Sequence, residues 1–359
     1  MKERTKSVLM IVMAAFAALI YAGALWGIQW LEGVWYYDWL DYLFKAGGAL
    51  LTGLLILLAV RTGQNKRWIW MSLCILAAVP IFACFNCSVY RSLWYFGKEN
   101  VLTVWPLLCF LAAKLPAKKL PFWLHALLYQ VFAAVATWYL WEQVFGGTYF
   151  AADVAAEAYM YLSAVVVFVL CRHQTKKLKK AEFLSFLAVT AAVVVFWLTH
   201  QERLEFIYLS MKEDPTLRDS EGQLVNWWAY RMGVLEALTE GRLDYALPHY
   251  INQYIENCPL IWIWMVGAEW VAVTVPVILV LLCVGLVDRA KRLWQVSSFP
   301  AVIAAAWILR LAMGIVTNLL AIYCTEVSLP LAVGMDLLPI ILAVGLPVAK
   351  KQAEQPQEE

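Results

Sequence analysis

Long apolar blocks, separated by short polar stretches, run through most of the chain. The blocks are about 15 to 25 residues long, and a helix of that length matches a hydrocarbon core about 30 Å thick. The pattern predicts an all-α fold, a polytopic transmembrane helical bundle of about ten spans. The predicted spans are 8–28, 43–60, 68–85, 101–115, 122–141, 154–171, 183–200, 259–287, 299–323 and 329–348. The fourth is short and contains Pro106, so a half-helix or a re-entrant segment is the alternative there.

The overall composition agrees with lipid as the solvent. Of the 359 residues, 63% are hydrophobic and 15% are charged, and the mean hydropathy is +0.67. Soluble domains average about 45–50% apolar and about 25% charged residues. A soluble fold has too little interior to hide this much apolar surface.

Positive charges cluster in every second connection, and the connections between them carry mainly acids. Under the positive-inside rule this alternation predicts a multi-pass protein of the cell membrane with both termini in the cytoplasm. The basic connections contain Lys2, Arg4 and Lys6; Arg61, Lys66 and Arg67; Lys114, Lys118 and Lys119; Arg172, Lys176, Lys177, Lys179 and Lys180; Arg289, Lys291 and Arg292; and Lys350 and Lys351. The acidic connections contain Glu32, Asp38, Asp41, Glu142, Asp153, Glu157 and Glu326.

The longest connection, 201–258, is predicted to lie outside the cell between spans seven and eight. Within it, residues 224–238 place apolar side chains at helical spacing and include Trp227 and Trp228, which suits a helix lying at the membrane surface. No separate soluble domain is apparent, so residues 1–351 are expected to form one transmembrane domain. The polar residues 352–359 are expected to form a disordered tail.

Three ionisable residues fall inside the late apolar blocks, where a charge is expensive and usually faces the bundle interior. Counted from the outer ends of their spans, Glu269, Arg310 and Asp336 lie at depths of roughly 15, 20 and 10 Å. We expect Arg310 to pair with Glu269, or otherwise with Asp336. Such a pair either fixes helix packing or lines a polar cavity for a charged substrate or a lipid headgroup.

The remaining chemistry-bearing residues indicate no cofactor, no metal site and no nucleic-acid partner. The net charge is only +2, and the basic residues lie in short connections rather than on one face. Most cysteines lie in apolar blocks as small packing residues. A disulfide remains possible among Cys84, Cys87, Cys258 and Cys324, which are expected on the outer side.

Several local stretches resemble the SEDS family (shape, elongation, division and sporulation), which includes RodA, FtsW and SpoVE. In the outer loop the resemblance is carried by Asp214-Pro215, Tyr230, Ala237-Leu238, Gly241 and Leu247-Pro248. It continues through MVGAEWVAV (265–273), MGIVTNLL (313–320) and SLPL (328–331), and covers roughly residues 200–347. Upstream of residue 200, span number and topology alone match the family.

The resemblance implies a protein of cell wall synthesis, cell shape or division. SEDS members have ten spans and cytoplasmic termini, and they polymerise lipid II into peptidoglycan outside the membrane together with a class B penicillin-binding protein. In this chain the resemblance implies that a lipid-linked glycan precursor meets the cations Arg203, Arg231 and Arg310. Glu269 and Asp336 would complete the substrate site.

Three family motifs are altered. The family's closing Ser-Tyr-Gly-Gly is replaced around VGMD (333–336), and its Asn in span nine aligns with Ala312. The Asp of the family's Thr-Asp-Phe, which acts in glycosyl transfer, falls near Leu260 or Ile261, and the nearest acid is Glu256. Either Glu256 serves as the general base for the attacking hydroxyl, or the protein has lost catalysis and acts as a scaffold or regulator.

Two other classes remain open. A transporter or lipid-handling membrane protein would require paired broken helices near the midplane, whereas only Pro106 and Pro276 interrupt the blocks. A polyprenyl-linked glycan polymerase or ligase of the O-antigen type would use an arginine-containing outer loop and often a histidine, here His249.

Overall fold

The computed structural model describes residues 3–32, part of 102–114, 120–139, 152–175, 179–199, 269–296 and 298–320. All regular structure within these ranges is helical. The helices are α1 (Glu3–Glu32), α5 (Phe122–Trp138), α6 (Ala152–Thr175), α7 (Lys180–Thr199), α12 (Glu269–Val296) and α13 (Ser298–Leu320). The described positions of 102–114 are helical as well.

Four of these helices are long and apolar enough to cross a membrane. Their candidate spans are Thr5–Ala24, Ala155–His173, Lys180–Thr199 and Trp270–Asp288, whereas Phe122–Trp138 and Ala304–Asn318 are shorter apolar helices. Their length and composition indicate a membrane protein. Predicted spans two, three and ten and the outer loop 201–258 lie outside the described residues.

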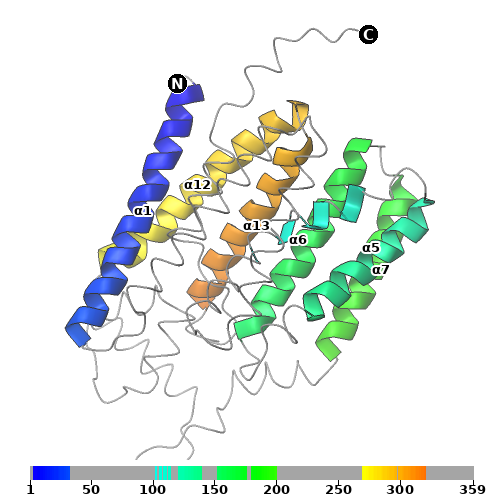
Figure 1. Ribbon diagram of the computed structural model, residues 1–359, viewed down its shortest axis with the longest axis horizontal. Coiled ribbons are helices and arrows are strands. Elements are labelled where there is room, and N and C mark those ends of the chain that lie inside the picture. The colour runs from blue at the N-terminus through cyan, green and yellow to red at the C-terminus, as the bar shows by residue number, and fades with distance from the viewer. Residues whose placement is uncertain are drawn as a thin grey trace, which may run out of the picture.

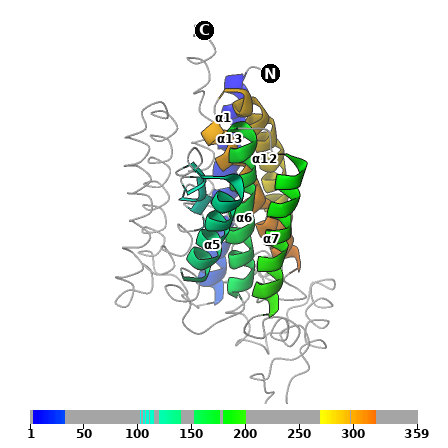
Figure 2. The ribbon, with the colours of Figure 1, turned by 90° about the vertical axis from the view of Figure 1, so that its right-hand side faces the viewer.

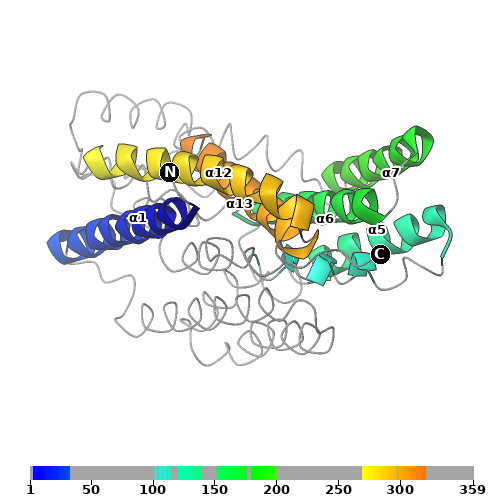
Figure 3. The same ribbon diagram turned by 90° about the horizontal axis from the view of Figure 1, so that it is seen from above.

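The helices pack in a row with a branch at one end. Helix α1 packs against α12, α12 against α13, and α13 against α6, while α5 contacts both α6 and α7. Figure 3 shows α13 between α12 and α6, and Figure 2 shows α6 between α5 and α7. Helix α6 therefore joins the two sides of the bundle.

The basic connections adjoining these helices lie at one end of the bundle. The start of α1, the α12–α13 junction and the α6–α7 junction are all found there, at the top of Figure 1. Lys6 at this end forms an ion pair with Asp288 at 3.4 Å. Arg172 and His173 occupy the last turn of α6, where a positive charge also interacts favourably with the helix dipole. One-sided clustering of cations is what the alternating charge pattern requires.

Observed helices are longer than the predicted spans where charged residues beyond the span are also helical. Helix α12 runs to Val296, nine residues beyond the predicted end at 287, because Ala, Lys, Arg and Leu are all good helix formers. Charge ends a membrane span without ending the helix that carries it. At the start of α7, the carboxylate of Glu182 accepts a hydrogen bond from the amide of Lys179 at 3.1 Å, which caps the first turn.

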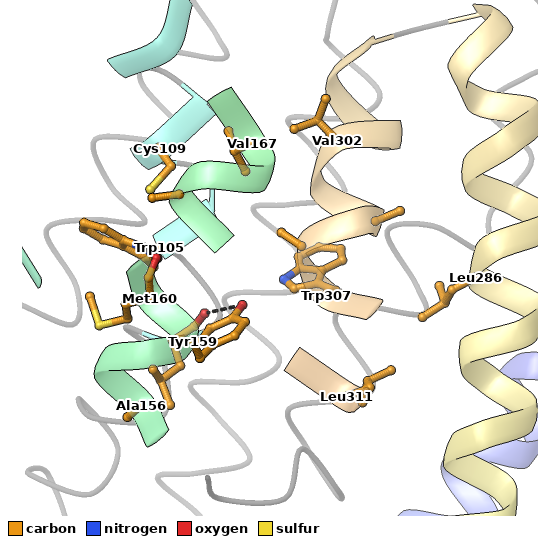
Figure 4. Packing of buried hydrophobic residues seen from close by; sticks show 14 of the residues in the cluster. Trp105, Cys109, Ala156, Tyr159, Met160, Val167, Leu286, Val302, Trp307 and Leu311 are labelled. Atoms are coloured by element: carbon orange, nitrogen blue, oxygen red, sulfur yellow. Dashed lines mark hydrogen bonds between the residues drawn. The ribbon is translucent and has the colours of Figure 1, made fainter. Parts of the chain in front are cut away.

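The buried core follows α6 and its neighbours. Figure 4 shows Tyr159 and Val167 of α6 on one side of Trp307 in α13, with Leu286 of α12 on the other. In the predicted fourth span, Trp105 is buried and its indole N–H donates to the carbonyl of Met160 at 2.7 Å. This part of the chain packs into the bundle interior.

Candidate functional site

Arg310 is the most completely buried cation among the described residues, with 0% of its surface exposed. It lies twelve residues into α13, or about 18 Å from the start of the helix, close to the middle of a hydrocarbon core. Its guanidinium carbon lies 5.9 Å from the ring centroid of Tyr159 in α6, within the range of a cation–π interaction. The Tyr159 hydroxyl in turn donates to the carbonyl of Leu102 at 3.3 Å. The α6–α13 contact thus holds a positive charge deep in the apolar bundle.

The helix register separates Arg310 from its first predicted partner. Helices α12 and α13 pack against each other with a single residue between them, and they run in opposite directions (Figure 1). Counting back from this junction, Arg310 is level with residue 284 of α12, and Glu269 is fifteen residues farther along, about 22 Å away along the axis. The side chain of Glu269 is not described, so its pairing with Arg310 stays a prediction.

The other predicted site residues fall in parts of the chain that are not described. Arg203, Arg231 and Glu256 of the outer loop and Asp336 of the last predicted span are outside the described residues, and so is the side chain of Glu269. Of the predicted site, Arg310 alone has a described side chain. The pairing of Arg310 with Asp336 stays a prediction.

A chain of buried polar side chains crosses the contact between α5, α6 and α7. The hydroxyl of Tyr161 donates to the amide oxygen of Gln130. The amide nitrogen of Gln130 donates to the hydroxyl of Thr190 at 2.7 Å, and Thr190 donates to the carbonyl of Phe186 at 2.9 Å. Gln130 therefore joins three helices, and in an apolar setting its two interhelical hydrogen bonds contribute to holding them together, whereas the bond from Thr190 to Phe186 lies within α7.

Glu157 is a buried acid that the sequence analysis had placed in an acidic connection. It lies inside α6 and is only 2% exposed. The indole N–H of Trp197 in α7 donates to its carboxylate at 2.5 Å. An acid near the end of an apolar block resembles a loop residue in sequence, and only the packing of α7 on α6 distinguishes the two. A buried acid inside a span is itself a candidate functional group.

None of the three described cysteines forms a disulfide; Cys109 and Cys171 are buried and Cys283 is half-buried. Their positions agree with a packing role, whereas Cys84, Cys87, Cys258 and Cys324 lie outside the described residues. No group of three or more His, Cys, Asp or Glu residues that could hold a metal ion occurs in the described parts of the chain.

The site therefore consists of one buried cation on α13, one buried acid on α6 and a hydrogen-bonded polar chain across α5, α6 and α7. Arg310 and Trp197 approach α6 from opposite sides. Arg310 contacts Tyr159 and Trp197 contacts Glu157, and these two α6 residues are two positions apart, about 200° around the helix. A buried guanidinium can bind a diphosphate or carboxylate that reaches it. No family model, no curated protein and no solved structure matches the chain.

Proposed function

We propose that this chain is a divergent SEDS-type membrane protein that handles a lipid-linked glycan precursor at the outer face of the cell membrane. The proposed architecture has about ten spans with both termini in the cytoplasm. Its proposed role is in cell wall synthesis, together with a class B penicillin-binding protein. The resemblance of residues 200–347 to the family supports this role, and the clustering of basic residues at one end of the helices supports the topology.

The buried Arg310 is the observation on which the proposal depends most. A guanidinium near the middle of a membrane-spanning bundle is expensive, and such residues usually mark a substrate or ion pathway. A polyprenyl-diphosphate carries its negative charge where the glycosidic bond breaks, so a fixed cation stabilises the diphosphate as it leaves. In the proposal, Arg203 and Arg231 meet the same group from the outer loop, with Glu269 and Asp336 completing the site.

The proposed base for the reaction is Glu256, which would accept the proton of the attacking sugar hydroxyl. Removing a general base typically lowers the rate by about 10² to 10⁴. If the protein has lost turnover, the same site would bind the precursor and act as a scaffold or regulator. Binding and polymerisation therefore have to be measured separately.

The test uses the purified full chain with lipid II in detergent, with and without a class B penicillin-binding protein. We expect the wild type to bind lipid II, and Arg310→Gln to weaken binding more than Arg310→Lys, which keeps the charge. We expect Glu256→Gln to retain binding while polymerisation falls about 10²-fold or more. Glu182→Gln is the matched acid control. Glu182 lies in the first turn of α7, and its replacement should change neither binding nor polymerisation.

Each outcome separates one part of the proposal from the others. If the wild type binds lipid II without polymerising it, the scaffold form of the proposal stands and the catalytic form fails. Polymerisation that is unchanged by Glu256→Gln rules out Glu256 as the base. If the wild type binds no polyprenyl-diphosphate glycan at all, the functional proposal is wrong.

A further inference from the structure

The end of α5, α6 and α7 that carries their basic connections combines cations with aromatic rings. We define this basic end by Lys114, Arg172, Lys179, Lys180 and the ring of Phe122. The Arg172 guanidinium lies 5.2 Å from the ring centroid of Phe122, the first residue of α5. Lys114 lies over the ring of Phe110 at 5.5 Å. The contact between Arg172 and Phe122 therefore brings the end of α6 beside the start of α5.

The charge of the two connections at this end is strongly one-sided. Between residues 114 and 121 and between 172 and 182 the sequence holds eight Lys or Arg residues and one acid, Glu182. That acid is used in the first turn of α7, where its carboxylate accepts the amide N–H of Lys179. A cluster of four to eight Lys and Arg immediately beside membrane-spanning helices is typical of a site for anionic lipid headgroups.

An apolar stripe descends from the basic end along α5. Trp123 is 66% exposed beside Phe122, and Leu127, Val131 and Val135 follow it at four-residue spacing, all exposed. Residues at this spacing lie on one face of a helix. An indole at the end of a span suits the headgroup region, and the aliphatic side chains below it suit an acyl chain. A free anion would interact with the cations but would make no favourable contact with the apolar stripe.

We propose that the basic end binds one anionic phospholipid, whose headgroup phosphate meets Arg172, Lys179 and Lys180 and whose acyl chain lies along Trp123, Leu127 and Val131. The contact with Phe122 holds the Arg172 guanidinium at this end of the bundle. The site is independent of the proposed glycan chemistry and goes beyond it. It requires only that the helices sit in a membrane.

The chain offers a matched control at the same end of the bundle. The C-terminal part of α12 also carries cations, including Arg289 and Lys291, but these follow Asp288, which forms an ion pair with Lys6. Neutralising two cations at either place removes the same net charge. A general attraction between charged protein and anionic lipid would respond equally to both changes.

The test is native mass spectrometry of the purified full chain in neutral detergent, titrated with dioleoyl-phosphatidylglycerol or dioleoyl-phosphatidylcholine. We expect the wild type to bind the anionic lipid at least about tenfold more tightly than the neutral one. The double variant Lys179→Gln/Lys180→Gln should lose about 10- to 30-fold in affinity for phosphatidylglycerol. The control Arg289→Gln/Lys291→Gln should lose less than about threefold. Both variants should elute and unfold like the wild type, and the exposed positions of Lys179, Lys180 and Lys291 support this expectation. Trp123→Ala is the reserve variant if the lysine pair impairs folding.

Three results would overturn the proposal. The first is no preference for phosphatidylglycerol in the wild type. The second is an equal loss in both double variants, which would mean that only net charge matters. The third is displacement of the lipid by inorganic phosphate at millimolar concentration, which would show a site for a free anion rather than a phospholipid.

Discussion

The two sides of the bundle are held together by different kinds of contact. Around α6, buried polar side chains bridge the helices: Gln130 joins α5, α6 and α7, and Arg310 of α13 lies over Tyr159. Where α1 meets α12, Gly285 of α12 lies close to Met10 of α1, and the ion pair between Lys6 and Asp288 is half-exposed. Because lipid tails are as apolar as leucine, helices in a membrane associate through close packing or through interhelical hydrogen bonds. This protein uses hydrogen bonds around α6 and close packing at α1.

The largest effect is expected from Arg310, the deepest charge on the α6 side. Arg310→Ala removes a fully buried guanidinium from its contact with Tyr159 and leaves a cavity between α6 and α13. We expect a loss of about 2–5 kcal/mol in the free energy of unfolding, and a smaller loss for Arg310→Lys, which keeps the charge and most of the volume. Equilibrium unfolding of the purified protein in a fixed detergent measures both. A loss below about 1 kcal/mol for the alanine variant would remove the energetic distinction between the two sides.

The next effect is expected from Gln130, which hydrogen bonds to two other helices. Gln130→Leu keeps the approximate volume but removes its bonds to Tyr161 and Thr190, and we expect a loss of about 1–2 kcal/mol. A double-mutant cycle with Thr190→Val should show a coupling of about 0.5–1.5 kcal/mol. Thr199→Val is the control, because the Thr199 hydroxyl is exposed and bonds only within α7. Zero coupling would show that the polar chain does not hold these helices.

A smaller effect is expected where α1 packs on α12. A Cβ added at Gly285 would lie 3.0 Å from the sulfur of Met10, whereas one added at Gly23 of α1 would meet nothing within 4 Å. Gly23→Ala should therefore stabilise the protein by up to about 1 kcal/mol through helix propensity. At Gly285 the same gain is offset by the shift that Met10 has to make, so Gly285→Ala should fall below Gly23→Ala. Equal stabilisation by the two changes would show that close approach at Gly285 is unimportant.

The smallest effect is expected at the ion pair between Lys6 and Asp288. The side chains are 44% and 50% exposed, and exposed pairs contribute about 0–1 kcal/mol. Asp288→Asn should change stability by less than about 0.5 kcal/mol, and less still at high salt. If this change destabilised the protein as much as Gln130→Leu, the contrast between the two sides would be wrong.

The comparison also explains which features the sequence could predict. Arg310 was predictable because one charge inside a long apolar block stands out, and the positions of α1, α6, α7 and α13 followed from block length. The partners of buried polar groups were not predictable, since Gln130 and Thr190 are sixty residues apart and no local pattern links them. The apolar pattern predicts which residues of a helix lie in the membrane. Which residues of two neighbouring helices lie at the same height depends on where each helix ends.

Glu157 and α12 show the two ways in which charge misled the prediction. Glu157 near the start of an apolar block was assigned to a connection, yet it is buried in α6 against Trp197. At the other extreme, Arg289 and Lys291 ended the predicted eighth span, although α12 continues through them to Val296. At α12 the charges were interpreted as the end of the span, and at Glu157 the charge was interpreted as a position in a connection although the predicted span began at 154. Helix formation depends on backbone propensity, and burial depends on neighbours that only the tertiary structure supplies.

The proposed function depends on a topology in which the basic connections and both termini face the cytoplasm and the long loop faces outward. Cysteine-accessibility mapping in intact cells tests it most directly, with single cysteines introduced at Lys177, Gln223 and Gln355 in a chain whose native cysteines are replaced by serine or alanine. With this topology we expect a membrane-impermeant maleimide to label position 223 in intact cells, and to label 177 and 355 only after the membrane is permeabilised. Labelling of position 177 or 355 in intact cells, or protection of 223 until permeabilisation, would contradict the topology and the proposed function that depends on it.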